Sequence, residues 1–269
     1  MSDAALDLKL CAALASRDER QIRRRLPATS TLGLIDFNSN DYLSLSSSHN
    51  LRNRYLAKLA DAPDILGSGG SRLLVNGQAH TALEARLSKF FSSEAALLFN
   101  SGFDANVGFF SCIPQPGDVI VYDEFIHASV HDGIRASRTR RAVPFAHNSV
   151  HSLRQVLTQA LAQEDLSGLR TGANSVFVAV ESLYSMDGTF SPLSAIVQVL
   201  ETFFPHGNAH LVVDEAHSTG IYGPQGRGRV AQLGLESKVL VRLHTFGKAL
   251  AASGGASLFF VCRARPLIP

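Results

Sequence analysis

The sequence contains little cysteine and little excess charge, and each of these features excludes some classes of protein. Its three cysteines, Cys11, Cys112 and Cys262, are odd in number and widely scattered, which indicates neither a disulfide framework nor a zinc site. A reducing compartment therefore suits the chain better than an oxidising one. The net charge of +2 is too small to indicate binding to nucleic acid or to an acidic membrane surface.

Long apolar runs are also absent. No stretch approaches the roughly 18 consecutive apolar residues that a membrane-spanning helix needs. The N-terminus lacks the apolar centre of a secretory signal, and its acidic residues argue against a transit peptide; these residues are Asp3, Asp7, Asp18 and Glu19. We therefore expect a cytoplasmic protein, although an organellar signal in a longer C-terminal form would not be visible here.

The sequence does contain an alternation of short apolar runs and longer amphipathic segments. With 269 residues, of which 45% are hydrophobic, the chain can bury a substantial core. The pattern predicts strands at 35–37, 95–99, 118–122, 142–145, 175–180, 210–213, 239–243 and 254–262. It predicts helices at 4–26, 51–59, 80–91, 129–137, 153–161 and 192–204, and another that begins after residue 101. The prediction is an α/β fold, with a mostly parallel sheet flanked by helices.

Polar residues recur just after the ends of these predicted strands, at one edge of the sheet, where open α/β folds place their ligands. Asp214 and Lys248 follow two successive strands, and this pair suits a cofactor that needs a covalent amine and a fixed negative charge, such as pyridoxal phosphate (PLP). Taken singly, each position has a plainer explanation, such as a hydrogen-bonded histidine or a surface turn. The other members of the set are Ser101, Gly102, His127, Glu181, Ser185, His217 and Thr245.

An ATPase is a rival hypothesis, because residues 212–217 resemble the Walker B segment of nucleic-acid helicases. The phosphate-binding loop does not support it. Gly247 and Lys248 form the only Gly-Lys pair, which lies after that segment, precedes Ala249 and lacks the upstream glycine spacing of a P-loop. The glycine-rich residues 67–72 match neither the P-loop nor the dinucleotide pattern, and a flexible connector explains them equally well.

Six motifs, in this order along the chain, resemble those of the α-oxoamine synthases, which are fold-type I PLP enzymes. The resemblance runs from about residue 23 to about residue 256. It implies PLP as the cofactor, an amino acid and an acyl-CoA as substrates, release of CO2 and CoA, and a homodimer, with no metal, nucleic acid or membrane involved. The motifs are Asn40–Leu43, Gly67–Arg72, His127–Ser129, Ser185–Gly188, Asp214–His217 and Thr245–Ala249.

The resemblance also implies catalytic roles for four residues. Lys248 would hold PLP as a Schiff base and then remove the α-proton of the substrate. Asp214 would pair with the pyridine nitrogen and keep it protonated, so that the ring accepts electrons from the substrate carbanion. His217 would hydrogen-bond the phenolic oxygen of the cofactor, and His127 would stack on its ring.

Further positions are implied to bind the cofactor or the substrates. Backbone N–H groups of Gly102 and Phe103 and the hydroxyl of Thr245 would bind the phosphate, and Ser185 would lie near a cofactor oxygen. Weaker matches, on the acyl-substrate side, are Arg23 and Asn40.

Residues 67–71 and 144–148 look most like the 8-amino-7-oxononanoate synthase subfamily, which joins alanine to pimeloyl-CoA in the biotin pathway. Glycine C-acetyltransferase, 5-aminolaevulinate synthase and serine palmitoyltransferase stay open as alternatives. We expect an N-terminal helical segment at 1–35, a PLP-binding large domain at 36–262 and a truncated tail at 263–269. The small C-terminal domain of the family is expected to be missing. A second hypothesis is therefore an inactive PLP-binding remnant, or a regulatory partner of a full-length subunit.

Overall fold

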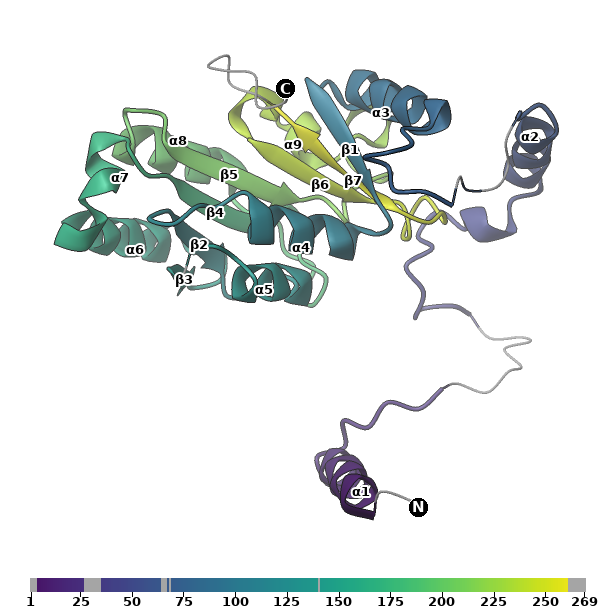
Figure 1. Ribbon diagram of the computed structural model, residues 1–269, viewed down its shortest axis with the longest axis horizontal. Coiled ribbons are helices and arrows are strands. Elements are labelled where there is room, and N and C mark those ends of the chain that lie inside the picture. Colours follow the sequence, from purple (N-terminus) through teal and green to yellow (C-terminus); the bar gives the residue numbers. More distant parts are fainter. Residues whose placement is uncertain (1–3, 27–34, 64–66, 68, 140, 261–269) are drawn as a thin grey trace. The chain divides into compact units, whose positions relative to one another are not determined.

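The computed structural model describes residues 4–26, 35–63, 67, 69–139 and 141–260. The chain divides into two compact units, Met1–Ser39 and Asn40–Pro269. Helices and strands are labelled in Figure 1. None of the helices in the described ranges is long and apolar enough to cross a membrane. The tail expected at 263–269 lies outside these ranges.

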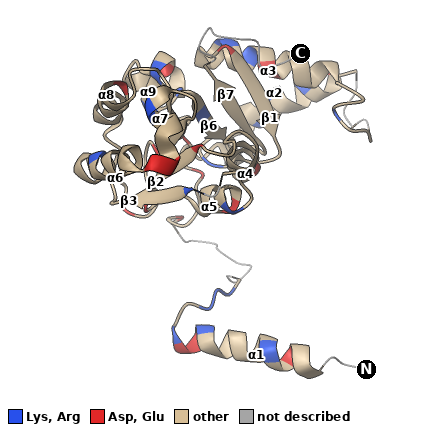
Figure 2. Ribbon diagram, turned by 60° about the vertical axis from the view of Figure 1, so that its left-hand side comes forward, with Lys and Arg blue, Asp and Glu red and all other residues tan. Residues whose placement is uncertain are grey.

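The described residues of the first unit form one helix, α1 (Ala4–Glu19), which buries no side chain and carries both basic and acidic residues (Figure 2). The sequence predicted that this helix would continue to residue 26, and this was wrong. Gln21 adopts a left-handed φ of 55°, and the N–H groups of Gln21 and Ile22 donate to the carbonyls of Asp18 and Arg17. This pattern is a Schellman motif, which ends the helix without the glycine that usually marks it.

The strand predicted at 35–37 was also wrong. No strand occurs among the described residues of the first unit, so this segment has none there with which to pair. Instead, the side-chain carboxylate of Asp36 accepts hydrogen bonds from the backbone N–H groups of Asn38 and Ser39, both at 2.9 Å. Such a local turn satisfies the backbone groups that a strand would have used.

The second unit is built on a seven-stranded sheet with the order β1-β7-β6-β5-β4-β2-β3 among the described residues (Figure 1). Strands β2 to β6 pair in parallel, whereas β7 is antiparallel to both β6 and β1. The predicted mostly parallel sheet is therefore confirmed. The strands are β1 (Ala95–Phe99), β2 (Val119–Asp123), β3 (Ala142–Phe145), β4 (Val176–Glu181), β5 (Ala209–Asp214), β6 (Val241–Thr245) and β7 (Gly255–Phe259).

Helices cover both faces of the sheet, as predicted. One face packs against α4 and α5, and the other against α6 and α8. The last predicted strand is shorter than expected and ends at residue 259. The helices of this unit are α2 (His49–Ala60), α3 (Gln78–Phe91), α4 (Gly102–Cys112), α5 (Ala128–Arg135), α6 (Val150–Ala162), α7 (Ser167–Thr171), α8 (Leu193–Phe203) and α9 (Arg229–Gln232).

The alternation of side chains along β4 shows how the core is divided. Val176, Val178 and Val180 point into the cluster formed with α6 and α8. Phe177 and Ala179 point into the cluster formed with α4 and α5. Every residue of β4 is buried, as expected for a central parallel strand with helices on both faces. Side chains at the end of such a strand emerge into a region that is already largely shielded from water.

We predict that Gly133→Ala destabilises the fold. Gly133 lies in α5 against α4, and an added Cβ would lie 2.8 Å from Phe110 Cβ and 3.1 Å from the carbonyl oxygen of Asn106. Overpacking of this kind lowers the free energy of unfolding by about 1–3 kcal/mol, which urea denaturation would measure. Gly67→Ala, whose Cβ would meet nothing within 4 Å, is the control. An unchanged midpoint in Gly133→Ala would contradict this close packing.

Candidate active site

Four polar side chains lie at the carboxyl ends of neighbouring parallel strands. Asp123 ends β2, Glu181 ends β4, Asp214 ends β5 and Thr245 ends β6. Glu181 and Asp214 are direct partners in the register of β4 and β5. Because parallel strands share this edge, polar groups from distant parts of the sequence converge here, as predicted from the strand ends alone.

A cavity of about 210 Å³ opens at this edge of the sheet. The structure brings together six of the residues predicted for the cofactor site, drawn from α4, the start of α5, β5, β6 and the segment after β6. Four further residues line the same cavity. Its lining consists of Ser101, Gly102, Phe103, Asn106, His127, Glu181, Asp214, Ala216, Thr245 and Lys248.

The carboxylate of Asp214 is buried and is held by neutral donors. One oxygen accepts from the side-chain amide of Asn106 at 2.7 Å, and the other accepts from the backbone N–H of Ala216 at 2.8 Å. Neither donor carries a charge, so the negative charge of Asp214 is fixed in place without being neutralised. Asn106 has no place among the sequence predictions, because it lies inside a helix rather than at a strand end. Its spacing of four residues from Gly102 was the available signal.

Asn106 also connects Asp214 to His127. Its amide donates a second hydrogen bond, at 3.0 Å, to the hydroxyl of Ser129. That hydroxyl lies 2.7 Å from Nδ1 of His127, which also accepts from the backbone N–H of Ser129 at 3.2 Å. His127 is the N-cap of α5, so its ring is fixed at the start of the helix. One network thus holds both the acid and the histidine of the cavity.

Lys248 and His217 meet on the opposite side of the site. The Lys248 amine lies 2.7 Å from Nε2 of His217. Burial lowers the pKa of Lys248, although Asp214 and Glu181 oppose this shift. Burial, followed by the nearby charge of Lys248, lowers the pKa of His217 to about 4. His217 is therefore neutral at physiological pH, and a larger fraction of Lys248 is present as the free, nucleophilic amine.

Glu181 differs from its neighbour Asp214. Burial, followed by the negative charge of Asp214, raises the pKa of Glu181 to about 8. Two adjacent carboxylates cannot both ionise cheaply in a shielded site, so one retains a proton. At neutral pH the Glu181 side chain is mostly a neutral acid, and the strand-end pair carries one negative charge rather than two.

A second cavity, of about 230 Å³, lies on the other side of His217. Ser185 lines this cavity together with His217, and not the one that contains Lys248, so His217 is the predicted cofactor residue with which the structure brings Ser185 together. Tyr42 lines it too, and its hydroxyl lies 2.8 Å from Nδ1 of His217. Asn40 accepts a hydrogen bond from that hydroxyl at 2.9 Å. The sequence motif contained Tyr42, but no role was predicted for it.

Arg23 belongs to the first unit. Within its own unit, its guanidinium forms an ion pair with Asp18 of α1 at 2.5 Å. The carboxylate of Asp18 also lies 3.6 Å from the guanidinium of Arg25. The substrate-side role implied for Arg23 stays a prediction.

The N-terminus of α4 forms one wall of the site. Ser101 caps it by accepting from the N–H of Asp104. A Cβ on Gly102 would lie 2.9 Å from Cβ of Thr245, and a Cβ on Gly255 would lie 2.6 Å from the nitrogen of Gly102. Both glycines are therefore required for β6, β7 and the start of α4 to approach so closely. Free N–H groups at a helix N-terminus beside a hydroxyl suit a phosphate.

Glu215, the residue after Asp214, fixes the backbone next to the site. The sequence predicted no role for it. It is fully buried, and its carboxylate accepts from the backbone N–H groups of Arg229 at 2.8 Å and Val230 at 2.7 Å. The hydroxyls of Ser182 and Ser218 donate to it as well. Burial raises the pKa of Glu215 while these hydrogen bonds lower it. Glu215 thereby ties the segment after β5 to the start of α9.

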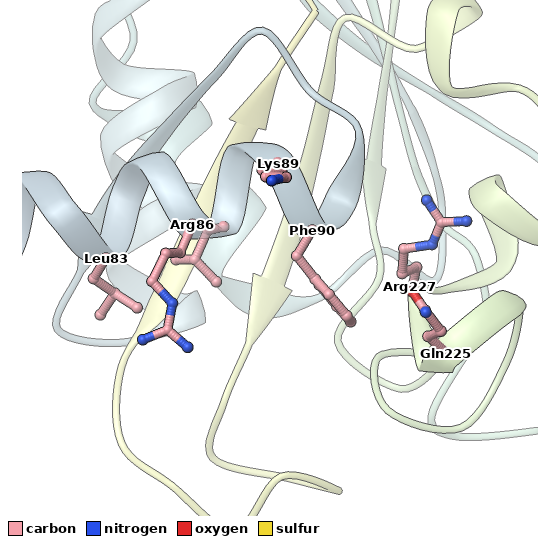
Figure 3. A pocket seen from close by; sticks show the side chains of 7 residues that line it. Leu83, Arg86, Lys89, Phe90, Gln225 and Arg227 are labelled. Carbon is pink, nitrogen blue, oxygen red and sulfur yellow. The ribbon is translucent and has the colours of Figure 1, made fainter. Parts of the chain in front are cut away.

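A larger cavity, of about 690 Å³, is separate from this site (Figure 3). Leu83, Leu87 and Phe90 of α3 provide its apolar surface, and Arg86 and Lys89 add charge. Gln225 and Arg227 line the opposite side. Among the residues that the structure describes, it shares no lining residue with the two cavities above and has no acidic side chain in its lining to pair with a base. Its size therefore does not make it the candidate active site.

Comparison with known proteins identifies the family. The profile described as "Aminotransferase class I and II" matches residues 33–265. The chain belongs to this family. It is 48% identical over 252 residues to an 8-amino-7-oxononanoate synthase of Emericella nidulans, covering 91% of this chain. It is 43% identical over 226 residues to aminoacyl transferase sphA of Aspergillus fumigatus, covering 83% of this chain. These relatives bear out the resemblance to the α-oxoamine synthases.

Solved structures agree with this assignment. A serine palmitoyltransferase from S. paucimobilis, solved with a bound PLP–myriocin aldimine, has a TM-score of 0.76 and 25% identity, covering 97% of this chain and 67% of its own. The family and this neighbour support the expected cofactor. The chain spans 60% and 48% of the lengths of the two curated relatives above.

We predict that Glu181→Gln makes the stability of the protein less dependent on pH. Below about pH 4.5, Glu181 is protonated in both the folded and the unfolded chain; above it, the unfolded chain releases this proton while the folded chain keeps it up to about pH 8. The wild-type free energy of unfolding therefore falls across this range as pH rises.

Denaturant titrations at pH 5 and pH 8 would measure this difference. Glu181→Gln should lose less stability between the two values than the wild type does. Glu201→Gln, at a carboxylate whose side chain is 55% exposed, is the matched control and should behave like the wild type. Equal pH dependence in Glu181→Gln and the wild type would contradict the raised pKa.

Proposed function

We propose that this chain binds PLP covalently through Lys248 and that its site serves the decarboxylative condensation of an amino acid with an acyl-CoA. The observation that carries the proposal is that the amine of Lys248 and the fixed carboxylate of Asp214 face one cavity. A covalent amine and an acid partner for the ring nitrogen are the two features that PLP enzymes require.

The residues present fit this cofactor. Lys248 would bind it, Asp214 would pair with its ring nitrogen, and His127 would lie against its ring. The N–H groups of Gly102 and Phe103 at the start of α4 would bind the phosphate, next to the hydroxyl of Thr245. A Cβ added at Gly102 would lie only 2.9 Å from Cβ of Thr245. The absence of a side chain at Gly102 therefore keeps the hydroxyl of Thr245 next to the start of α4, where a phosphate would bind. When bound, PLP supplies a ring that accepts electrons from the α-carbon of the substrate.

The chain's own residues then control protons. The lowered pKa of Lys248 suits it to attack a carbonyl and to take a proton from the α-carbon of the substrate. The donors to Asp214 are the neutral amide of Asn106 and the backbone N–H of Ala216, and they hold its carboxylate in place for the ring nitrogen. Glu181, which is largely protonated, adds no second negative charge that would compete for the same proton. The site therefore presents one base and one fixed anion.

We infer that the substrates are alanine and pimeloyl-CoA, as in the 8-amino-7-oxononanoate synthases. The supporting observation is the relative of that name at 48% identity. The relatives named aminoacyl transferase and serine palmitoyltransferase keep the other condensations of this class as alternatives. Glycine C-acetyltransferase and 5-aminolaevulinate synthase chemistry stay among them. A panel of small amino acids against acyl-CoAs of increasing chain length separates these alternatives. We also propose that the chain forms a homodimer, as the family resemblance implies.

A second candidate is a PLP-binding subunit without turnover, which acts as a regulatory partner of a longer homologous subunit. Co-purification with a longer homologue, together with PLP binding but no product, would support this candidate. Turnover by the isolated chain would exclude it.

We predict that the purified chain mixed with PLP gains an absorption band near the visible edge, which borohydride removes while fixing the cofactor to the protein. Lys248→Ala should lack this band, because no amine remains in the cavity to form the bond. Lys238→Ala is the matched control: Lys238 is an exposed lysine paired with Glu201 at 2.6 Å, and its loss should leave the spectrum unchanged.

The decisive readout is the position of the fixed label. After reduction and proteolysis, the modified peptide should contain Lys248. Identical spectra for the wild type and Lys248→Ala, or a label at other lysines, would overturn the proposal. Product formation is assayed only once the bond is established, so a failure of turnover is not mistaken for a failure of cofactor binding.

A further inference from the structure

His217 lies between two groups that fix the position of its ring proton. The hydroxyl of Tyr42 lies 2.8 Å from Nδ1 and the amine of Lys248 lies 2.7 Å from Nε2. The hydroxyl of Tyr42 has one hydrogen, which it donates to the side-chain oxygen of Asn40 at 2.9 Å. An amide oxygen can only accept, so the Tyr42 oxygen must accept from His217. The ring proton therefore lies on Nδ1, and Nε2 has a free lone pair toward Lys248.

Charge and burial agree with this arrangement. The pKa of His217, lowered to about 4, means that its ring has one proton and not two. Burial raises the pKa of Tyr42, so its hydroxyl keeps the hydrogen that it donates to Asn40. The hydrogen bonds then run in one direction, from Lys248 through His217 and Tyr42 to Asn40. In the opposite tautomer, Nε2–H would point at an ammonium group and two lone pairs would face each other at Tyr42.

His127 is held in the opposite way. The backbone N–H of Ser129 donates to its Nδ1 at 3.2 Å, so Nδ1 is an acceptor. The hydroxyl of Ser129 already accepts from Asn106 at 3.0 Å, which leaves its hydrogen directed at the same Nδ1, 2.7 Å away. A neutral His127 ring must therefore have its proton on Nε2.

We propose that the two histidines of the site hold opposite neutral tautomers, with His217 protonated on Nδ1 and His127 on Nε2, and that Tyr42 is the positioning residue that selects the form of His217. In this arrangement, Nε2 of His217 accepts a hydrogen bond from Lys248, whereas Nε2–H of His127 is a hydrogen-bond donor. This inference deepens the proposed function, on which its catalytic meaning rests, since it assigns to His217 the task of orienting the Lys248 amine. The tautomers themselves are properties of the protein without PLP.

Nitrogen-15 NMR of the full chain labelled at its histidine rings, at neutral pH and without PLP, tests the inference directly. Protonated and unprotonated ring nitrogens have well separated chemical shifts, and couplings to the ring carbon-bound hydrogens tell Nδ1 from Nε2. The chain has ten histidines, so spectra of His217→Gln and His127→Gln identify the two signals. We expect opposite tautomers at the two positions. The same tautomer at both, or a doubly protonated His217, would overturn the inference.

Variants separate the effect of Tyr42 from that of Lys248. In Lys248→Ala, His217 should keep its proton on Nδ1, because Tyr42 and Asn40 still require it. Adding Tyr42→Phe should shift His217 toward the Nε2 form, which free histidine prefers, while the His127 signal stays unchanged. Tyr222→Phe in the same Lys248→Ala background is the matched control, since Tyr222 lines the same cavity but contacts the ring of Phe190.

Two further results complete the test. If His217 keeps its Nδ1 proton in Lys248→Ala/Tyr42→Phe, Tyr42 is not the selecting residue. If that variant does not fold, Asn40→Ala replaces Tyr42→Phe; it frees the Tyr42 hydrogen to be donated to Nδ1 and should produce the same shift. All spectra are recorded without PLP, so the tautomers can be confirmed even if the protein does not bind the cofactor. Equally, the protein can bind PLP even if the tautomers are not as proposed.

Discussion

The placement of two carboxylates side by side at the ends of buried strands is the constraint on which the site depends. Glu181 and Asp214 are paired in register, and burial with mutual repulsion leaves Glu181 largely protonated. Asp214 keeps one fixed charge because its partners, Asn106 and the backbone of Ala216, donate without neutralising it. A lysine or arginine as partner would have stabilised the same carboxylate but would have cancelled the charge that a cationic ring nitrogen needs.

Burial also acts on the basic groups of the site, and there it outweighs the two carboxylates. His217 is buried beside Lys248, so a second positive charge there would be costly, and its pKa falls to about 4. Lys248, itself buried, has a lowered pKa. Burial thus disfavours the charged forms of Glu181, His217 and Lys248.

The sequence was sufficient to predict the sheet and the edge at which the site lies. Alternating apolar runs located the strands of the second unit to within a few residues, because burial on both faces leaves a clear pattern. It could not predict the antiparallel direction of β7, because an apolar run has no direction. The strand expected at 35–37 failed because strands depend on partners, and the end of α1 was missed because Gln21 occupies a position that usually requires glycine. Asn106 and Glu215 were missed because their importance lies in hydrogen bonds across the fold rather than in local pattern.

The antiparallel β7 has a consequence for how the protein is made. Gly255 at the start of β7 packs against the nitrogen of Gly102, and Ser101 is bridged to Gly254. The start of α4 leaves the ribosome early, but the strand against which it packs is among the last parts of the sheet to be synthesised. Both segments must have left the ribosome before this contact can form. The wall of the cavity at the start of α4 is therefore not complete on a growing chain until β7 has been translated and has paired with its neighbours.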